Sequence, residues 1–279
     1  MSAFLIVLAL SQASSASIQD VFCTGENPTM AVEWVASPKS TEAVAISCSC
    51  NCTGPENTVA IVELSSTQPK VLLWAEELRS FQISSAASDR WPSVKFYADK
   101  DDSRTGKGAL VDSVSVSGNG DYAPKGKIAF QTSGTIDKSY LAVVSENQEK
   151  LRILADAQLK IGYDLGLGFF KKKQLDKAID QLKLTSSKLP LRASSAALFN
   201  DLGYFLEQAN RAAEAIAVLE KVVAFDTTRT PAYLNLADAY QKSGDKAKAK
   251  QNYQKYVDQM EKNGKAAKVP ARVREFLKR

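Results

Sequence analysis

The chain has 279 residues, a net charge of +5 and 44% hydrophobic side chains, which is enough for one large domain or two modest domains that each bury a core. It contains no histidine, and this excludes Ser-His-Asp and Cys-His catalysis as well as histidine-ligated zinc. An enzyme of this composition would have to use carboxylates, lysine or a cofactor.

The first 17 residues are uncharged and contain a short apolar run, residues 3–10, followed by small side chains. The run is too short to span a bilayer, but it matches the core of a secretory signal peptide with cleavage after Ala16 or Ser17. A buried N-terminal strand is the alternative. We predict a signal peptide at residues 1–17, a periplasmic or secreted protein, and no transmembrane segment later in the chain.

The cysteines cluster near the N-terminus. In an oxidising compartment they would pair into disulfides, and we predict one bridge to Cys23. On a strand, the C-x-C-x-C run would place its three sulfurs on one face, because side chains alternate. The alternative is a four-thiolate zinc or copper(I) centre, since closely spaced thiolates chelate soft metals. Our prediction contains no metal and no cofactor. The disulfide candidates are Cys23, Cys48, Cys50 and Cys52.

Residues 18–141 have the pattern of a β-rich domain. Short segments rich in β-branched and aromatic residues alternate with turn formers, which is typical of an antiparallel sandwich or barrel. Alternation in residues 32–35 and 59–63 predicts at least one solvated sheet face. The predicted strands are residues 30–36, 42–48, 58–64, 70–75, 78–84, 93–98, 109–116 and 127–132.

From about residue 142 the hydrophobic period changes to that of a helix. We expect a connecting helix at 142–158, a helical region at 159–263 and a basic capping helix at 264–279. Residues 1–149 carry 11 Lys/Arg and 17 Asp/Glu, whereas residues 150–279 carry 25 and 14. We favour solvated helix faces over nucleic-acid or anionic-surface binding as the explanation of the basic half.

A 34-residue unit occurs twice without a gap in residues 196–263. Placing Gly203 over Ala237 also places Ala215 over Ala249 and Leu219 over Tyr253. The unit resembles the tetratricopeptide repeat, a helix-turn-helix with small residues at positions 8 and 20. A third, more divergent copy is residues 159–192. The fold class is therefore α+β multidomain: an antiparallel β-sandwich or barrel, then an α-helical tetratricopeptide solenoid.

The resemblance implies a concave groove, lined by the first helix of each unit, that binds peptides or proteins. Its residues make an acidic, hydrogen-bonding surface with aromatic anchors, suited to a basic extended segment. None of the residues of the family's carboxylate clamp stands at the clamp positions here. The predicted lining is Tyr163, Asp164, Leu167, Asn200, Asp201, Tyr204, Asn235 and Asp238.

The resulting hypothesis is an exported, non-enzymatic adaptor without catalytic residues. The alternative is a hydrolytic or carbohydrate-active β-domain that uses carboxylates such as Glu76, Glu77 or Asp99, with the repeats as a docking arm. Adjacent Glu76 and Glu77 on a strand would point to opposite faces, which argues against their cooperation.

Overall fold

The computed structural model describes residues 23, 28–37, 41–49, 57–65, 68–78, 80–83, 91–97, 110–116, 122–123, 134–189 and 191–278. It divides into two compact units, Met1–Leu159 with Ser187–Pro190, and Lys160–Ser186 with Leu191–Arg279. The predicted signal peptide, the predicted strand at 127–132, Cys50 and Cys52 lie outside the described residues.

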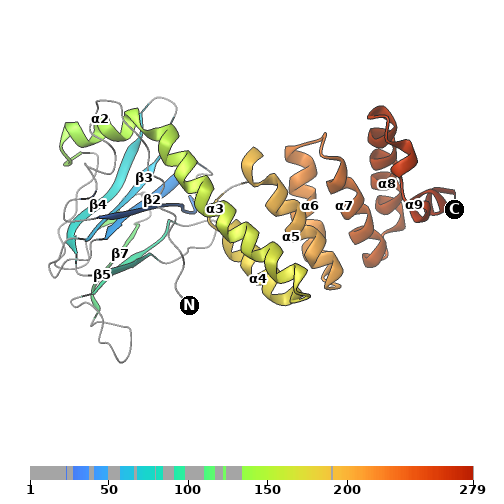
Figure 1. Ribbon diagram of the computed structural model, residues 1–279, viewed down its shortest axis with the longest axis horizontal. Helices are drawn as coiled ribbons and strands as arrows, with labels where there is room; N and C mark the ends of the chain where they lie inside the picture. Colours follow the sequence, from blue (N-terminus) through green and yellow to red (C-terminus); the bar gives the residue numbers. More distant parts are fainter. Residues whose placement is uncertain are drawn as a thin grey trace. The chain divides into compact units, whose positions relative to one another are not determined.

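The first unit contains two antiparallel sheets (Figure 1). The first sheet has the order β1 (Thr29–Trp34), β2 (Ala43–Ser49), β3 (Asn57–Glu63) and β4 (Lys70–Leu78). The second has the order β5 (Ser80–Ile83), β6 (Val94–Tyr97), β7 (Leu110–Val116) and β8 (Tyr122–Ala123). Within each sheet, strands that are neighbours in sequence pair with one another, and the described strands form open sheets rather than a barrel.

The two sheets share one hydrophobic core. Val59 and Ile61 of β3 and Leu73 of β4 belong to the same buried cluster as Val94 and Phe96 of β6. This cluster covers one face of the first sheet. It accounts for every second side chain of β3, as the period of a strand requires.

The opposite face of the first sheet is covered by α2 (Lys138–Glu146) and the beginning of α3 (Gln148–Lys171) (Figure 1). The ring of Trp74 stacks on that of Tyr140 at 4.9 Å, and Nε1 of Trp34 donates a 2.9 Å hydrogen bond to Asp156. Consequently β3 is buried on both faces from Asn57 to Val62. The prediction of a solvated face is wrong for this strand, because both of its faces are apolar.

A disulfide joins Cys23 to Cys48, which lies in β2. This confirms the predicted bridge to Cys23. It also removes two of the sulfurs that a four-thiolate metal centre would need. β2 ends at Ser49, so the described strand carries one of the clustered cysteines and not a row of them.

The second unit is a series of helix pairs. The C-terminal part of α3 pairs with α4 (Leu175–Ser186), α5 (Ala196–Gln208) with α6 (Ala212–Phe225), and α7 (Thr230–Ser243) with α8 (Lys246–Lys262). A final helix, α9 (Ala271–Lys278), packs on α8. None of the helices that the structure describes is long and apolar enough to cross a membrane.

Close approach within each pair depends on the residue at position 8. A Cβ added to Gly166 would lie 2.5 Å from Cδ2 of Leu182, and one added to Gly203 would lie 2.4 Å from Cγ of Leu219. In the last pair, buried Ala237 and buried Tyr253 hold these two positions. In the first two pairs the small residue and the large residue therefore fit each other closely.

The turn between the two helices is the same in each pair. It contains one residue with positive φ, at equivalent positions: Lys173 (59°), Asn210 (59°) and Gly244 (89°). Glycine adopts this conformation without cost, asparagine tolerates it, and lysine pays a steric penalty from its Cβ. A further glycine with positive φ, Gly264, follows the C-cap of α8, where this conformation commonly ends a helix.

Candidate protein-binding surface

The first helices of the three pairs are joined by a chain of polar side chains. The hydroxyl of Tyr163 on α3 donates a 2.6 Å hydrogen bond to Asp201 on α5. Nδ2 of Asn200 donates to the same carboxylate at 3.0 Å, and Nδ2 of Asn235 on α7 donates to Oδ1 of Asn200 at 3.2 Å. We call the surface around this chain the first-helix face.

An aromatic cluster lies beside these polar groups. The ring of Phe170 stacks on that of Phe205 at 4.1 Å and meets the edge of Tyr204 at 5.9 Å. Phe205 is buried, whereas Tyr204, Phe170 and Leu167 are partly exposed. The partly exposed side chains offer an apolar contact area next to hydrogen-bonding groups, a combination typical of binding surfaces.

Two of the three aspartates of the predicted lining form ion pairs within the chain. Asp238 accepts two hydrogen bonds from the guanidinium of Arg272 on α9, at 2.5 and 2.8 Å. Asp164 forms an exposed ion pair with Lys160. Within the described residues no ion pair involves Asp201. The face is therefore closer to charge-balanced than acidic, and Asp201 is the carboxylate whose charge has no cationic partner there.

The hydrogen bond to Asp201 also affects Tyr163. Burial and the adjacent carboxylate together raise the pKa of the Tyr163 phenol well above its usual range, with burial the larger cause. The pKa of Tyr253, which donates a 2.5 Å hydrogen bond to Asp238, is raised for the same two reasons. Both phenols are therefore fixed as donors at neutral pH, and both tie a groove aspartate to a neighbouring helix.

The structure thus separates the predicted lining into groups. Tyr163, Asn200, Asp201 and Asn235 come together in one network. The remaining four do not join it: Tyr204 belongs to the aromatic cluster, Asp238 binds Arg272, Asp164 binds Lys160, and Leu167 is partly exposed.

The sequence analysis did not identify two residues that contribute to the first-helix face, Phe170 and Arg272. Phe170 lies three residues after Leu167 on α3, about one helical turn away. A helical-wheel projection would therefore have placed it on the same face. Arg272 stands 34 residues after Asp238, one full repeat length. Continuing the repeat numbering beyond residue 263 would have placed it opposite the preceding helix.

The described residues give no support to a catalytic role for Glu76, Glu77 or Asp99, the carboxylates proposed for the alternative enzyme. Glu76 is exposed on β4, and the side chain of Glu77 and all of Asp99 lie outside the described part of the chain. An open pocket of about 470 Å³ in the first unit is lined by two other carboxylates, Glu42 and Glu63. Arg152 donates to Glu42 at 2.6 Å, and the Thr41 hydroxyl donates to Glu63 at 2.6 Å. Both are engaged in structural contacts.

Residues 206–271 match the family model described as tetratricopeptide repeat. This stretch is a tetratricopeptide repeat region. The match begins within α5 and extends to the first residue of α9, so it contains the third helix pair and the helix α6 before it. The first helix of the predicted lining, α3, lies before the matched residues. No curated protein matches the chain.

Several solved structures are similar to this chain. The first domain of Spaghetti (RPAP3), solved with an HSP90 peptide, is 18% identical, with 44% of this chain and 96% of that chain covered and a TM-score of 0.39. PcrH from Pseudomonas aeruginosa is 16% identical, with 44% and 90% covered and a TM-score of 0.39. SycD from Yersinia enterocolitica, with a YopD peptide, is 15% identical, with 44% and 91% covered and a TM-score of 0.40.

Proposed function

We propose that this protein is an exported, non-enzymatic adaptor that binds a segment of another protein on the first-helix face. The observation that carries this proposal is the hydrogen-bond chain from Tyr163 through Asp201 and Asn200 to Asn235. It fixes polar groups from three consecutive first helices in one arrangement before any partner arrives. Such preorganisation lowers the entropic cost of binding.

The chemistry of the first-helix face indicates which kind of segment would bind to it. Asp201 has no cationic partner among the described residues and offers its charge beside the partly exposed ring of Tyr204. An extended segment with one Lys or Arg next to an apolar side chain fits this arrangement, since the cation would meet Asp201 and the apolar group would meet Tyr204 and Leu167. A strongly basic segment fits less well, because Asp164 and Asp238 already hold Lys160 and Arg272.

The test is an affinity capture with the full chain, followed by calorimetry on a peptide from the captured protein. Tyr204→Ala removes the aromatic contact, and Asp201→Asn removes the charge while keeping an acceptor for Tyr163. We expect each variant to weaken binding about tenfold or more. Glu261→Lys, on the exposed surface of α8, is the matched control and leaves affinity unchanged. If all variants bind with the same affinity as the unchanged chain, the partner does not bind on the first-helix face.

Export is the second element of this proposal. The disulfide between Cys23 and Cys48 supports it, because such bonds persist in oxidising compartments. Fractionation of cells that express the chain, with mass spectrometry of its N-terminus, should give an oxidised protein that starts near residue 17 or 18. A full-length, reduced chain found in the cytosol would contradict export, but it would not affect the proposal that a partner binds on the first-helix face.

A further inference from the structure

The guanidinium of Arg229 has no acceptor in the part of the chain that the structure describes. Arg229 stands between α6 and α7 and is the N-cap residue of α7. Its Nε atom is buried and makes no hydrogen bond, and none of the ion pairs among the described residues involves its side chain. Because a buried charged donor is unfavourable without an acceptor, this position is suited to an anionic group that arrives from outside the chain.

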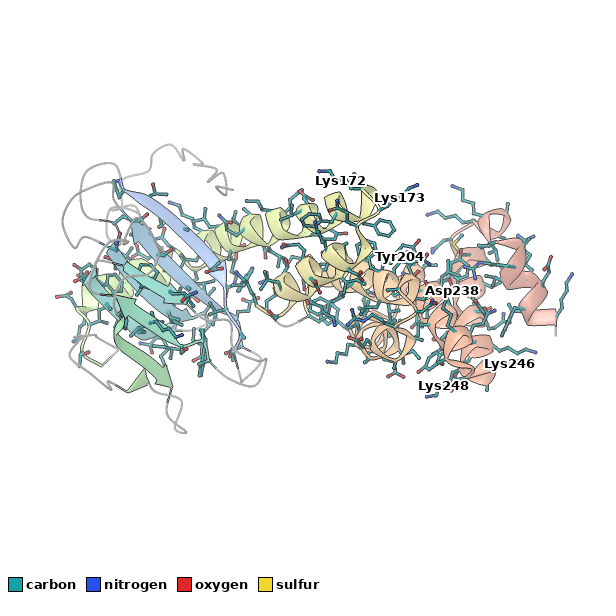
Figure 2. The ribbon with its side chains drawn as sticks, turned by 90° about the horizontal axis from the view of Figure 1, so that it is seen from below. Lys172, Lys173, Tyr204, Asp238, Lys246 and Lys248 are labelled. Carbon is teal, nitrogen blue, oxygen red and sulfur yellow. A yellow bond between two sulfur atoms is a disulfide. The ribbon has the colours of Figure 1, made fainter. Side chains whose placement is uncertain are left out.

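Arg229 lies beside the first-helix face. Burial and the carboxylate of Asp201 raise the pKa of the Tyr163 phenol, and the positive charge of Arg229 partly opposes this rise. The guanidinium is therefore close to the hydroxyl that Tyr163 donates to Asp201. The face continues over α5 and α7, which contact each other and carry the labelled side chains of Tyr204 and Asp238 (Figure 2). An arginine at the start of α7 can thus reach a segment bound on this face.

The beginning of α7 does not itself require an arginine. The side chain of Arg229 makes no capping hydrogen bond to the helix. The same residue type nevertheless occurs at the equivalent place one repeat earlier, where Arg192 is the N-cap of the short helix η1 (Ala193–Ser195) that leads into α5. Each arginine is the last residue of its repeat, 159–192 or 196–229. Helix formation therefore does not explain why Arg229 is an arginine.

The carboxylates near Arg229 do not pair with it. Asp226, three residues earlier, accepts hydrogen bonds from the amide and the hydroxyl of Thr228. These bonds lower the pKa of Asp226, and the charge of Arg229 adds a smaller decrease without an ion pair between the two side chains. Asp201 likewise forms no ion pair with Arg229 in the described ranges. Two opposite charges thus lie near the Tyr163 hydroxyl without binding each other.

These two charges together define the kind of ligand. Asp201 attracts a cation, and the planar guanidinium of Arg229 can bind a carboxylate through two parallel hydrogen bonds. A multiply charged anion such as phosphate fits less well, because Asp201 would repel it. In an extended segment alternate side chains point to the same side, so an acid and a base separated by one residue can meet both groups.

We propose that Arg229 binds an acidic side chain of the partner segment, next to the basic side chain that Asp201 receives. This inference rests on the proposed binding of a partner on the first-helix face, and it adds the charge pattern of the segment. A segment with charges of one sign would set one of its side chains against its like. The partner therefore carries an acid and a base on the same side of an extended chain.

Binding of the full chain to immobilised peptides tests this pattern. Acetylated nonapeptides hold one Lys, one Leu and one Glu among alanines, at every spacing and in both orders. Two parallel sets have Gln in place of Glu or in place of Lys. We expect the set with both charges to bind best, and Arg229→Gln to weaken that binding about tenfold. The same variant should bind the set without Glu as the unchanged chain does, because the lost contact is absent there.

Two further variants control for charge and for folding. Lys221→Gln removes an exposed cation from α6 and should bind every set like the unchanged chain. Arg229→Lys keeps the charge but not the two parallel bonds, so it should bind the Glu peptides with intermediate affinity. Thermal unfolding shows that each variant is folded, and Arg229→Lys supplies the comparison if Arg229→Gln does not fold.

The outcomes separate this inference from the proposed function. Equal weakening of peptides with and without Glu by Arg229→Gln would overturn the inference, because it would indicate a purely structural role. Equal affinity of the unchanged chain for the Glu and Gln sets would overturn it as well. If that binding is still lost in Tyr204→Ala, the first-helix face stands and only the role of Arg229 fails. If no peptide of any set binds, both proposals fail.

Discussion

Arg272 on α9 donates two hydrogen bonds, of 2.5 and 2.8 Å, to the carboxylate of Asp238 on α7. The hydroxyl of Tyr253 on α8 donates to the same carboxylate at 2.5 Å. One side chain of the predicted binding surface is thus shared by three helices. Asp238 holds the end of the helical unit together, and its charge is compensated within the chain.

We expect Arg272→Ala to lower the free energy of unfolding of the helical unit by about 1 kcal/mol, because the pair is bidentate but partly exposed to water. Arg272→Lys should recover only part of this loss, since an ammonium group cannot form the two parallel bonds. Urea unfolding followed by circular dichroism measures both. Lys278→Ala, exposed on the same helix, is the control. An equal effect of Arg272→Ala and Lys278→Ala would contradict the role of the pair.

The helix contacts at Gly203 make a second prediction. Gly203→Ala should destabilise the protein by about 1 to 3 kcal/mol, because its Cβ would lie 2.4 Å from Cγ of Leu219. Gly168→Ala is the matched control on α3, where an added Cβ meets no atom within 4 Å. That change should stabilise the helix by about 0.5 to 1 kcal/mol through its higher helix propensity. Thermal unfolding of both variants should give shifts of opposite sign.

The turn at Lys173 makes a third prediction. Lys173→Gly should stabilise the protein by about 0.5 to 1 kcal/mol, because φ at this residue is 59° and glycine removes the steric penalty. Lys172→Gly removes the same charge one residue earlier, where φ is not positive, and should lower stability slightly. If both substitutions destabilise the protein equally, the turn residue is not strained.

A fourth prediction concerns the stability of the fold at acidic pH. Hydrogen bonds from Arg211 and Lys183 lower the pKa of Glu214 from 4.5 to about 2. A lowered pKa stabilises the folded state above the unfolded value, and this stability is lost as the pH falls from about 4.5 toward 2. The carboxylate is half exposed, so water screens the pair and the effect should stay below about 1 kcal/mol. Unfolding measured at pH 6 and pH 3 should show a smaller difference for Glu214→Gln than for the unchanged chain.

Seven of the eight described strands and the helix pairs were accessible from the sequence because each is defined by residues close together in the chain, whereas the two-residue strand β8 (Tyr122–Ala123) was not predicted. Turn formers such as Gly54-Pro55 separate the strands, and the gapless alignment of Gly203 with Ala237 fixes the helix pairs. Burial of both faces of β3 was not accessible. It depends on α2 and α3, which follow β3 by more than 70 residues.

The binding surface was only partly predictable for a similar reason. Repeat positions locate Tyr163, Asp201 and Asn235 on the first helices, but they do not show which side chains bind one another. The compensation of Asp238 comes from Arg272, beyond the last complete repeat. Counting the aspartates at the lining positions, without their ion-pair partners, therefore overestimated how acidic the surface is.

The fit between position 8 and the position that Leu219 and Tyr253 hold on the second helix also limits how the helices of this chain can be recombined. Gly203 lies against the branched Leu219, whereas Ala237 and Tyr253 hold the equivalent positions of the next helix pair. A chimera that joins α7 to α6 would set the methyl group of Ala237 against Leu219, and one that joins α5 to α8 would leave space between Gly203 and Tyr253. The helix pair is accordingly the smallest piece of this chain that can be duplicated or exchanged without redesigning its interior.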